Sequence, residues 1–193
     1  RVYELLSGAV GTSDEYAARP AADREEPYER VTVYVGNNLA AFNEGVRENA
    51  DTVVKPAGEF WVTYAGTLGA SYDLSTLVQA AKLAEPQVSG LRVKILGDGP
   101  DRDKLTELAS SIGAPVDFLG YTPYERMAAW LVASDVTVNS LVHGAAQSIV
   151  TKIGDYLAAG LPMINTGESP EFCAKVEADG FGVNVAPGHA SAL

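Results

Sequence analysis

The chain has 193 residues, of which 47% are hydrophobic and 20% are charged, and its formal net charge is −11. This composition supports a packed core, excludes global disorder, and lacks the basic face that non-specific binding to nucleic acid or anionic lipid requires. One cysteine and two histidines exclude an internal disulfide and are too few for a Cys/His zinc site. No apolar run approaches the roughly 18–20 residues that span a bilayer, so we expect a cytoplasmic protein without metal or nucleic acid.

Residues 1–59 are irregular in pattern and too short to hold a core of their own. Residues 19–30 combine proline, alanine and mixed charge and indicate a loop. A strand is expected at 31–35 and a short helix at 37–43, followed by a polar linker over 44–59. Both ends of the chain interrupt a pattern, so we expect a segment of a longer protein, with residues 1–59 as the end of a preceding domain and an interdomain linker.

From residue 60 onward, short apolar runs alternate with helical spacing. Strands are expected at 60–66, 91–96, 116–119, 136–139, 162–165 and 183–185. Helices are expected around 74–81, 105–112, 124–134, 148–159 and from residue 169. This alternation predicts an α/β fold, a Rossmann-like parallel sheet with helices on both faces, over residues 60–193. Such sheets bind ligands beyond the carboxyl ends of their strands.

Glycine-rich loops follow the first two of these strands. Gly97, Asp98 and Gly99 follow one strand and precede a helix, a setting in which glycine lets the backbone approach a ligand. Gly66 and Thr67 lie in the corresponding position after the first strand. Neither loop carries the full G-x-G-x-x-G pattern, so a plain tight turn explains either one alone equally well.

Small residues lead into the helix predicted at 148–159. Free N–H groups near Ser148 and Ile149 would form an anion site at the mouth of this helix. Lys152 would add a positive charge, and Asp155, three residues further on the same side, would accept the two hydroxyls of a ribose. The same spacing is also explained by an exposed Lys152–Asp155 ion pair.

The order of motifs resembles the C-terminal half of a family 4 retaining glycosyltransferase with the GT-B fold, of the bacterial polysaccharide-building type. The matching segments are 64–68 (YAGTL), 95–100 (ILGDGP), 116–121 (VDFLGY) and 152–162 (KIGDYLAAGLP), with weaker likeness at 10–16 and 35–42. The resemblance covers roughly residues 60–187. It implies a pocket for a nucleotide sugar, with the reaction cleft completed by a preceding domain.

The resemblance also implies roles for single residues. The family's pair of glutamates falls on Gln147, expected at the donor sugar, and on Asp155, expected at the ribose. The arginine and lysine that neutralise the donor diphosphate in the family fall here on Thr67 and Tyr72, so Lys152 is expected to replace them. Lys152 and Gln147 are therefore the expected catalytic residues.

The remaining contacts implied by the resemblance surround the base and the sugar. Gly120 and Tyr121 would border the base, the loop from Gly97 would line its pocket, and His143 would touch the donor sugar, although an ordinary loop histidine explains His143 as well.

The expected activity is retaining transfer of a hexose from a nucleoside diphosphate sugar, without an obligatory metal, in polysaccharide or glycolipid assembly. The glycan or lipid-linked acceptor would bind through the missing domain, so the fragment alone would be inactive, and the full-length enzyme would associate peripherally with the inner face of the membrane. The alternative is a non-catalytic nucleotide- or partner-binding domain, favoured by the loss of positive charge at Thr67 and Tyr72.

Overall fold

The computed structural model describes residues 3–145 and 149–193, and its main body is a six-stranded sheet. All strand pairs are parallel, and the strand order is β5-β4-β3-β6-β7-β8. The strands are β3 (Phe60–Ala65), β4 (Leu91–Leu96), β5 (Val116–Gly120), β6 (Val136–Asn139), β7 (Met163–Asn165) and β8 (Gly182–Asn184). The predicted Rossmann-like sheet is thereby confirmed, and its order reverses between β3 and β6, where such sheets bind ligands.

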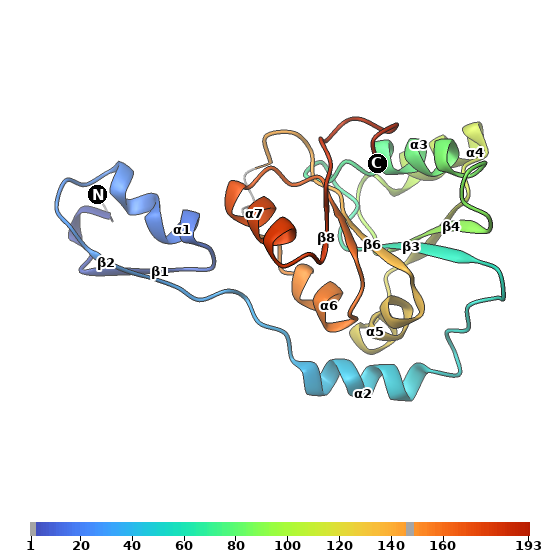
Figure 1. Cartoon of the computed structure of the whole chain (residues 1–193), viewed down its shortest axis with the longest axis horizontal. Coiled ribbons are helices and arrows are strands. Elements are labelled where there is room, and N and C mark those ends of the chain that lie inside the picture. Colours follow the sequence, from blue (N-terminus) through green and yellow to red (C-terminus); the bar gives the residue numbers. More distant parts are fainter. Residues whose placement is uncertain (1–2, 146–148) are drawn as a thin grey trace.

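Helices cover both faces of this sheet (Figure 1). They are α3 (Leu74–Ala84), α4 (Arg102–Ile112), α5 (Tyr124–Ala133), α6 (Ile153–Ala158) and α7 (Pro170–Ala178). One core cluster joins the sheet to α3 and α4, and a second joins it to α5, α6 and α7. Local signals fix the helix ends: the Asp73 side chain caps α3 by accepting from Thr76 N–H, and Gly113 ends α4 with φ of 60°.

The N-terminal part forms a small unit that Figure 1 shows beside the main body. It contains a 3₁₀ turn η1 (Tyr3–Leu5), strand β1 (Gly8–Gly11), helix α1 (Asp14–Ala18), a 3₁₀ turn η2 (Arg19–Ala22) and strand β2 (Glu29–Thr32). Strands β1 and β2 pair in parallel. The predicted strand at 31–35 is therefore shifted: pairing with β1 ends at Thr32, apart from one further bond from Val33 N–H to the Gly11 carbonyl.

The connection between the two parts contains α2 (Leu39–Asn49), which is longer than predicted. Phe42 is buried, and a side chain at Gly45 would meet the backbone of Glu125 in α5 at 2.6 Å. The sequence predicted a polar linker from residue 44 onward. Because α2 packs closely against α5, the helix instead continues to Asn49. No helix in the described parts of the chain is long and apolar enough to cross a membrane.

Helix α6 begins later than predicted. The pattern predicts a helix over 148–159, but α6 spans Ile153–Ala158, and Lys152 occupies its N-cap position. Ile149, Val150 and Thr151 are β-branched and have low helix propensity, and Val150 is buried in the core. The prediction of a helix mouth at Ser148 and Ile149 is therefore wrong for the described residue Ile149, whereas Ser148 lies outside the described residues.

Candidate functional site

A pocket of about 300 Å³ lies beyond the carboxyl ends of β3, β4 and β5. Its lining consists of Ala65, Gly66, Thr67, Leu96, Gly97, Asp98, Tyr121, Thr122 and Met127. Five of the residues predicted from the sequence therefore lie together: Gly66, Thr67, Gly97, Asp98 and Tyr121. We call this hollow the carboxyl-edge pocket. It adjoins β3, the strand at which the order of the sheet reverses.

The two glycine-rich loops are packed directly against each other. Gly97 has φ of 138°, and a Cβ atom there would lie 1.8 Å from the Gly66 carbonyl oxygen. A Cβ at Gly99 would lie 2.2 Å from the Leu68 carbonyl oxygen. Leu68 in turn accepts a hydrogen bond from Asp101 N–H at 3.1 Å. Loop packing therefore requires both glycines, and Gly99 serves the turn rather than the lining of the pocket.

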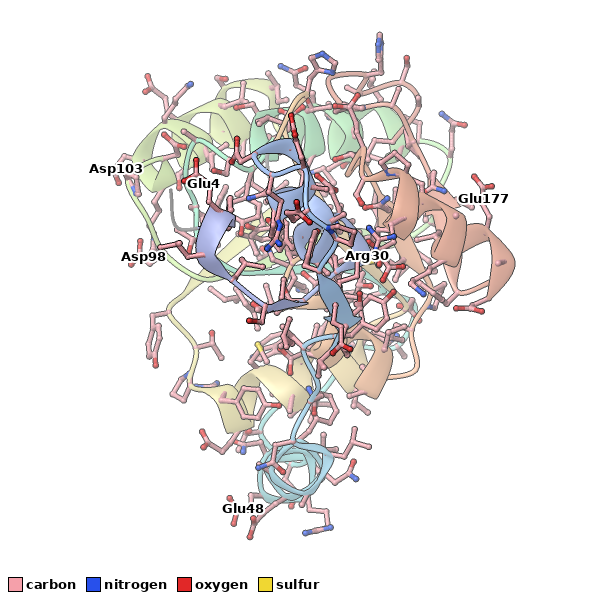
Figure 2. All side chains as sticks on the ribbon, turned by 90° about the vertical axis from the view of Figure 1, so that its left-hand side faces the viewer. Glu4, Arg30, Glu48, Asp98, Asp103 and Glu177 are labelled. Atoms are coloured by element: carbon pink, nitrogen blue, oxygen red, sulfur yellow. The ribbon has the colours of Figure 1, made fainter. Side chains whose placement is uncertain are left out.

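Gly120 also lies beside the carboxyl-edge pocket without lining it. A side chain there would meet the Arg102 guanidinium at 3.1 Å. Arg102 forms an ion pair with Asp98 at 3.2 Å, and Figure 2 shows Asp98 at the outer margin of the molecule. Arg102 was not predicted from the sequence, although its place in the first turn of α4, directly after the glycine-rich loop, was a usable signal.

Lys152 lies behind the first glycine loop. Its ammonium nitrogen is 4.0 Å from the ring centre of Tyr64 and 3.9 Å from that of Tyr72. A Cβ atom at Gly66 would be 2.6 Å from this nitrogen. The nitrogen is buried and has no hydrogen-bond partner among the described residues. Burial lowers the pKa of Lys152 to about 7. The interpretation of Lys152 as half of an exposed ion pair is therefore wrong.

Asp155 faces a different neighbourhood from Lys152. Its Oδ1 accepts hydrogen bonds from Asn37 Nδ2 at 2.6 Å and from the Tyr124 hydroxyl at 3.0 Å. Burial raises the pKa of this carboxyl group, and the two hydrogen bonds oppose the rise. The expectation that Lys152 and Asp155 act from the same side is not met, because Asp155 lies in the seam between α6, α5 and the connection before α2.

Two further predicted residues lie away from the carboxyl-edge pocket. The His143 side chain is 86% exposed, and its Nδ1 lies 2.9 Å from Glu168 Oε1. Ile149 lines an apolar pocket of about 260 Å³ together with residues of α6 and α7. Gln147 and Ser148 are outside the described residues, so their predicted roles stay predictions.

Glu168 is a residue that the sequence analysis missed. Its Oε2 accepts from Gly144 N–H at 2.8 Å, and this bond, followed by the one to His143, lowers the pKa of the carboxyl group. It borders a hollow of about 880 Å³ that also contains Asp14, Glu15 and Glu171. Arg19 is the single cation among the described residues that line it. This larger hollow is therefore a poor place for a diphosphate, and the carboxyl-edge pocket is the better candidate.

An asparagine ladder was also missed. Asn139, Asn165 and Asn184 end β6, β7 and β8 and are paired in register. Asn165 is fully buried, accepts from Asn139 Nδ2 at 2.9 Å and donates to Asn184 Oδ1 at 2.9 Å. It also donates to the Gly167 carbonyl and thereby holds the loop after β7. The sequence signal that could have predicted this ladder is that three successive strands each end in an asparagine.

Comparisons with known proteins bear on the family and the fold of the chain. The sequence profile that describes glycosyl transferases group 1 matches residues 59–193. A comparison with curated proteins gave no match.

Solved structures provide the fold-level likeness. HepE from Anabaena in complex with UDP is 17% identical, with a TM-score of 0.75 over 97% of this chain and 52% of that protein. Sucrose-phosphate synthase from Thermosynechococcus elongatus is 21% identical, with a TM-score of 0.77 over 99% of this chain and 48% of that protein. WaaG, a glycosyltransferase involved in lipopolysaccharide biosynthesis, is 15% identical, with a TM-score of 0.70 over 93% and 49% of the two chains. The chain therefore spans about half the length of these proteins.

Proposed function

The chain belongs to the group 1 glycosyl transferases, and from this premise we propose that its carboxyl-edge pocket binds a nucleoside diphosphate sugar as the donor for a retaining hexosyl transfer. The observation that carries the proposal is the position of this pocket, where two glycine loops meet at the carboxyl ends of β3 and β4 and a buried ammonium group lies behind Gly66. HepE, which shares this fold, has been crystallised with UDP.

In this proposal the protein stabilises the charge that develops on the leaving diphosphate. The backbone at Gly66 and Gly97 lets the phosphates come close, and Lys152 supplies the positive charge. Tyr121 and Thr122 border the base. The six-residue helix α6 is too short to contribute much dipole, so Lys152 has to carry more of this stabilisation than the sequence suggested.

The resemblance places the ribose at Asp155 and the donor sugar at Gln147. Asp155 is not among the described residues that line the carboxyl-edge pocket, and its Oδ1 accepts hydrogen bonds from Asn37 and Tyr124. We therefore assign no ribose contact to Asp155. Gln147 lies outside the described residues, and its role at the sugar rests on the resemblance of the motif alone. No metal enters the proposed reaction.

The wider role that we propose is the assembly of a polysaccharide or glycolipid at the inner face of the cell membrane, with peripheral membrane association of the complete enzyme. WaaG, which shares the fold, is a glycosyltransferase involved in lipopolysaccharide biosynthesis, and this likeness supports the proposed role. A glycan or lipid-linked acceptor would bind through a preceding domain. The present chain would bind nucleotide without transferring sugar.

Substitutions at Thr67 test the proposal. Thr67 is exposed and lines the carboxyl-edge pocket, so a charged side chain is accommodated there. By titration calorimetry we expect Thr67→Arg to tighten binding of UDP about five- to tenfold and Thr67→Glu to weaken it, with little effect on uridine. Ser111→Arg, an exposed site at the far end of α4, is the matched control and should change neither affinity. No binding of any nucleoside diphosphate by the unmodified chain would refute the proposal.

The second candidate is a non-catalytic nucleotide- or partner-binding domain. It is favoured by Thr67 and Tyr72, which stand where the resemblance places an arginine and a lysine. Tyr72 packs its ring against Lys152 and is thus part of the folded structure around that residue. Release of sugar from a bound donor, measured in the complete enzyme, distinguishes the two candidates, because a binding domain leaves the donor intact.

A further inference from the structure

The surroundings of Lys152 are unusual for a charged side chain. Two tyrosine rings lie about 4 Å from the ammonium nitrogen, Tyr64 from β3 and Tyr72 from the loop after it. Among the described residues the nitrogen has no hydrogen-bond partner and no ion pair. A buried ammonium group without a counter-charge is costly, and aromatic faces offset only part of that cost. Lys152 is therefore in an environment that favours the neutral amine.

The other ionisable groups nearby do not supply a negative charge. Tyr64 donates its hydroxyl hydrogen to the Thr67 carbonyl, and burial raises its pKa further. Burial likewise raises the pKa of Tyr156 on α6, whose hydroxyl binds the backbone of Ala65. The nearest carboxylate along the chain is Asp155, whose Oδ1 is bound by Asn37 and Tyr124. Tyr64 and Tyr156 therefore stay neutral over the physiological range.

Lys152 lies against Gly66, which is one of the residues of the carboxyl-edge pocket. Gly66 lines that pocket, and a Cβ atom on Gly66 would lie 2.6 Å from the ammonium nitrogen and 3.1 Å from Cε. The absence of a side chain at Gly66 thus lets the end of Lys152 lie directly against a backbone segment that lines the pocket.

Resting on the proposed function, we propose that a diphosphate arriving at Gly66 draws Lys152 out from between Tyr64 and Tyr72, and that Lys152 takes up one proton from solvent as it pairs with the phosphate. The proton adds to the lone pair of the neutral amine and gives an ammonium group; no other bond forms or breaks. Tyr64 and Tyr72 are positioning residues that hold the amine in the free protein. Donor binding and proton uptake are then one event.

The proposal fixes the pH dependence of donor affinity. In the free protein burial lowers the pKa of Lys152 to about 7, whereas pairing with phosphate restores a value near that of an ordinary lysine. At pH 8 binding should therefore take up about 0.9 proton, and affinity should fall about tenfold per unit between pH 8 and pH 9. The phosphates of the ligand contribute little there, because phosphate groups complete their ionisation near pH 6, about two units lower. The uracil ring is common to UDP and uridine, so the comparison with uridine accounts for its own ionisation.

Titration calorimetry with UDP in two buffers of different ionisation enthalpy measures this proton count. We expect uptake of nearly one proton per UDP at pH 8 and none for uridine, which has no phosphate. Lys152→Met should abolish the proton uptake and weaken the binding of UDP, whereas the affinity for uridine should stay unchanged. Lys104→Met, at an exposed position in the first turn of α4, is the matched control and should behave like the unmodified chain.

A second measurement does not depend on any variant at Lys152. The side-chain NMR signal of ¹³C-labelled lysine should titrate near pH 7 for one lysine of the free chain and move above pH 9 when UDP is bound. Replacing Tyr72 by Ala opens the surroundings to water, so proton uptake should decrease although Lys152 is retained. UDP binding without proton uptake overturns this inference alone, whereas failure to bind any nucleoside diphosphate overturns the proposed function as well.

Discussion

Lys152→Met is expected to stabilise the free protein, because it removes a buried charge that no described residue neutralises. The unfolded chain has an ordinary lysine pKa of 10.5, and burial lowers the folded value to about 7. This difference corresponds to about 5 kcal/mol at low pH. A methionine of similar length should therefore stabilise the fold by up to about 5 kcal/mol at pH 6.

The pH dependence gives this prediction a definite sign. Between pH 7 and 10.5 the unfolded state binds more protons at Lys152 than the folded state, so the free energy of unfolding of the unmodified protein rises with pH in that interval. Lys152→Met lacks this contribution. Its advantage should therefore be largest at pH 6 and should shrink steadily toward pH 9.5.

Urea unfolding at pH 6, 8 and 9.5 measures the effect, with Lys104→Met as the control for loss of an exposed lysine. A Lys152→Met protein that is less stable than the unmodified chain at pH 6, or an advantage that does not change with pH, would refute the reasoning about the buried charge. A variant that is more stable yet binds UDP more weakly would have the trade-off expected of a ligand-binding residue.

Three other substitutions test the structure around the site. Gly97→Ala should lower the free energy of unfolding by more than about 3 kcal/mol, because its Cβ would lie 1.8 Å from the Gly66 carbonyl oxygen at a φ of 138°. Thermal unfolding measures this loss, and a variant as stable as the unmodified chain would contradict the loop packing. Asn165→Ala should lower the free energy of unfolding in urea by about 2–4 kcal/mol, because the buried Asn139 and the half-buried Asn184 lose their bonds to it. A loss below about 1 kcal/mol would show that the ladder is dispensable. Tyr124→Phe should raise the pKa of Asp155 further, since a donor to its carboxylate is lost; NMR titration of that carboxyl group checks the direction, and a lowered pKa would contradict it.

The pattern of the main domain was predictable because it depends on local signals. Short apolar runs predicted β4 and β6 at their observed bounds and placed the other strands of the main sheet within two residues. Gly113, the observed C-cap of α4, is the stop that the sequence indicates. Parallel strand–helix alternation then places the glycine loops at one edge of the sheet, which is why Gly66, Thr67, Gly97, Asp98 and Tyr121 were found together.

The details of the charged residues were not predictable in the same way. The interpretation of Lys152 and Asp155 as neighbours on one helix face rested on spacing, but α6 starts only after Lys152, which lies at the N-cap. The partners of both residues come from distant parts of the chain: Tyr64 and Tyr72 for Lys152, and Asn37 and Tyr124 for Asp155.

The sequence by itself determined the order of the strands and helices and the edge of the sheet that carries the pocket, because hydrophobic periodicity and turn residues act within a few positions. The tertiary structure alone decided that α2 extends along α5, that three strand-ending asparagines form a ladder, and that the ammonium group of Lys152 is buried with no counter-charge among the described residues. Those features depend on contacts between residues far apart in the chain, and both the free-energy cost of a buried charge and the stability of a packed helix are set by what surrounds them.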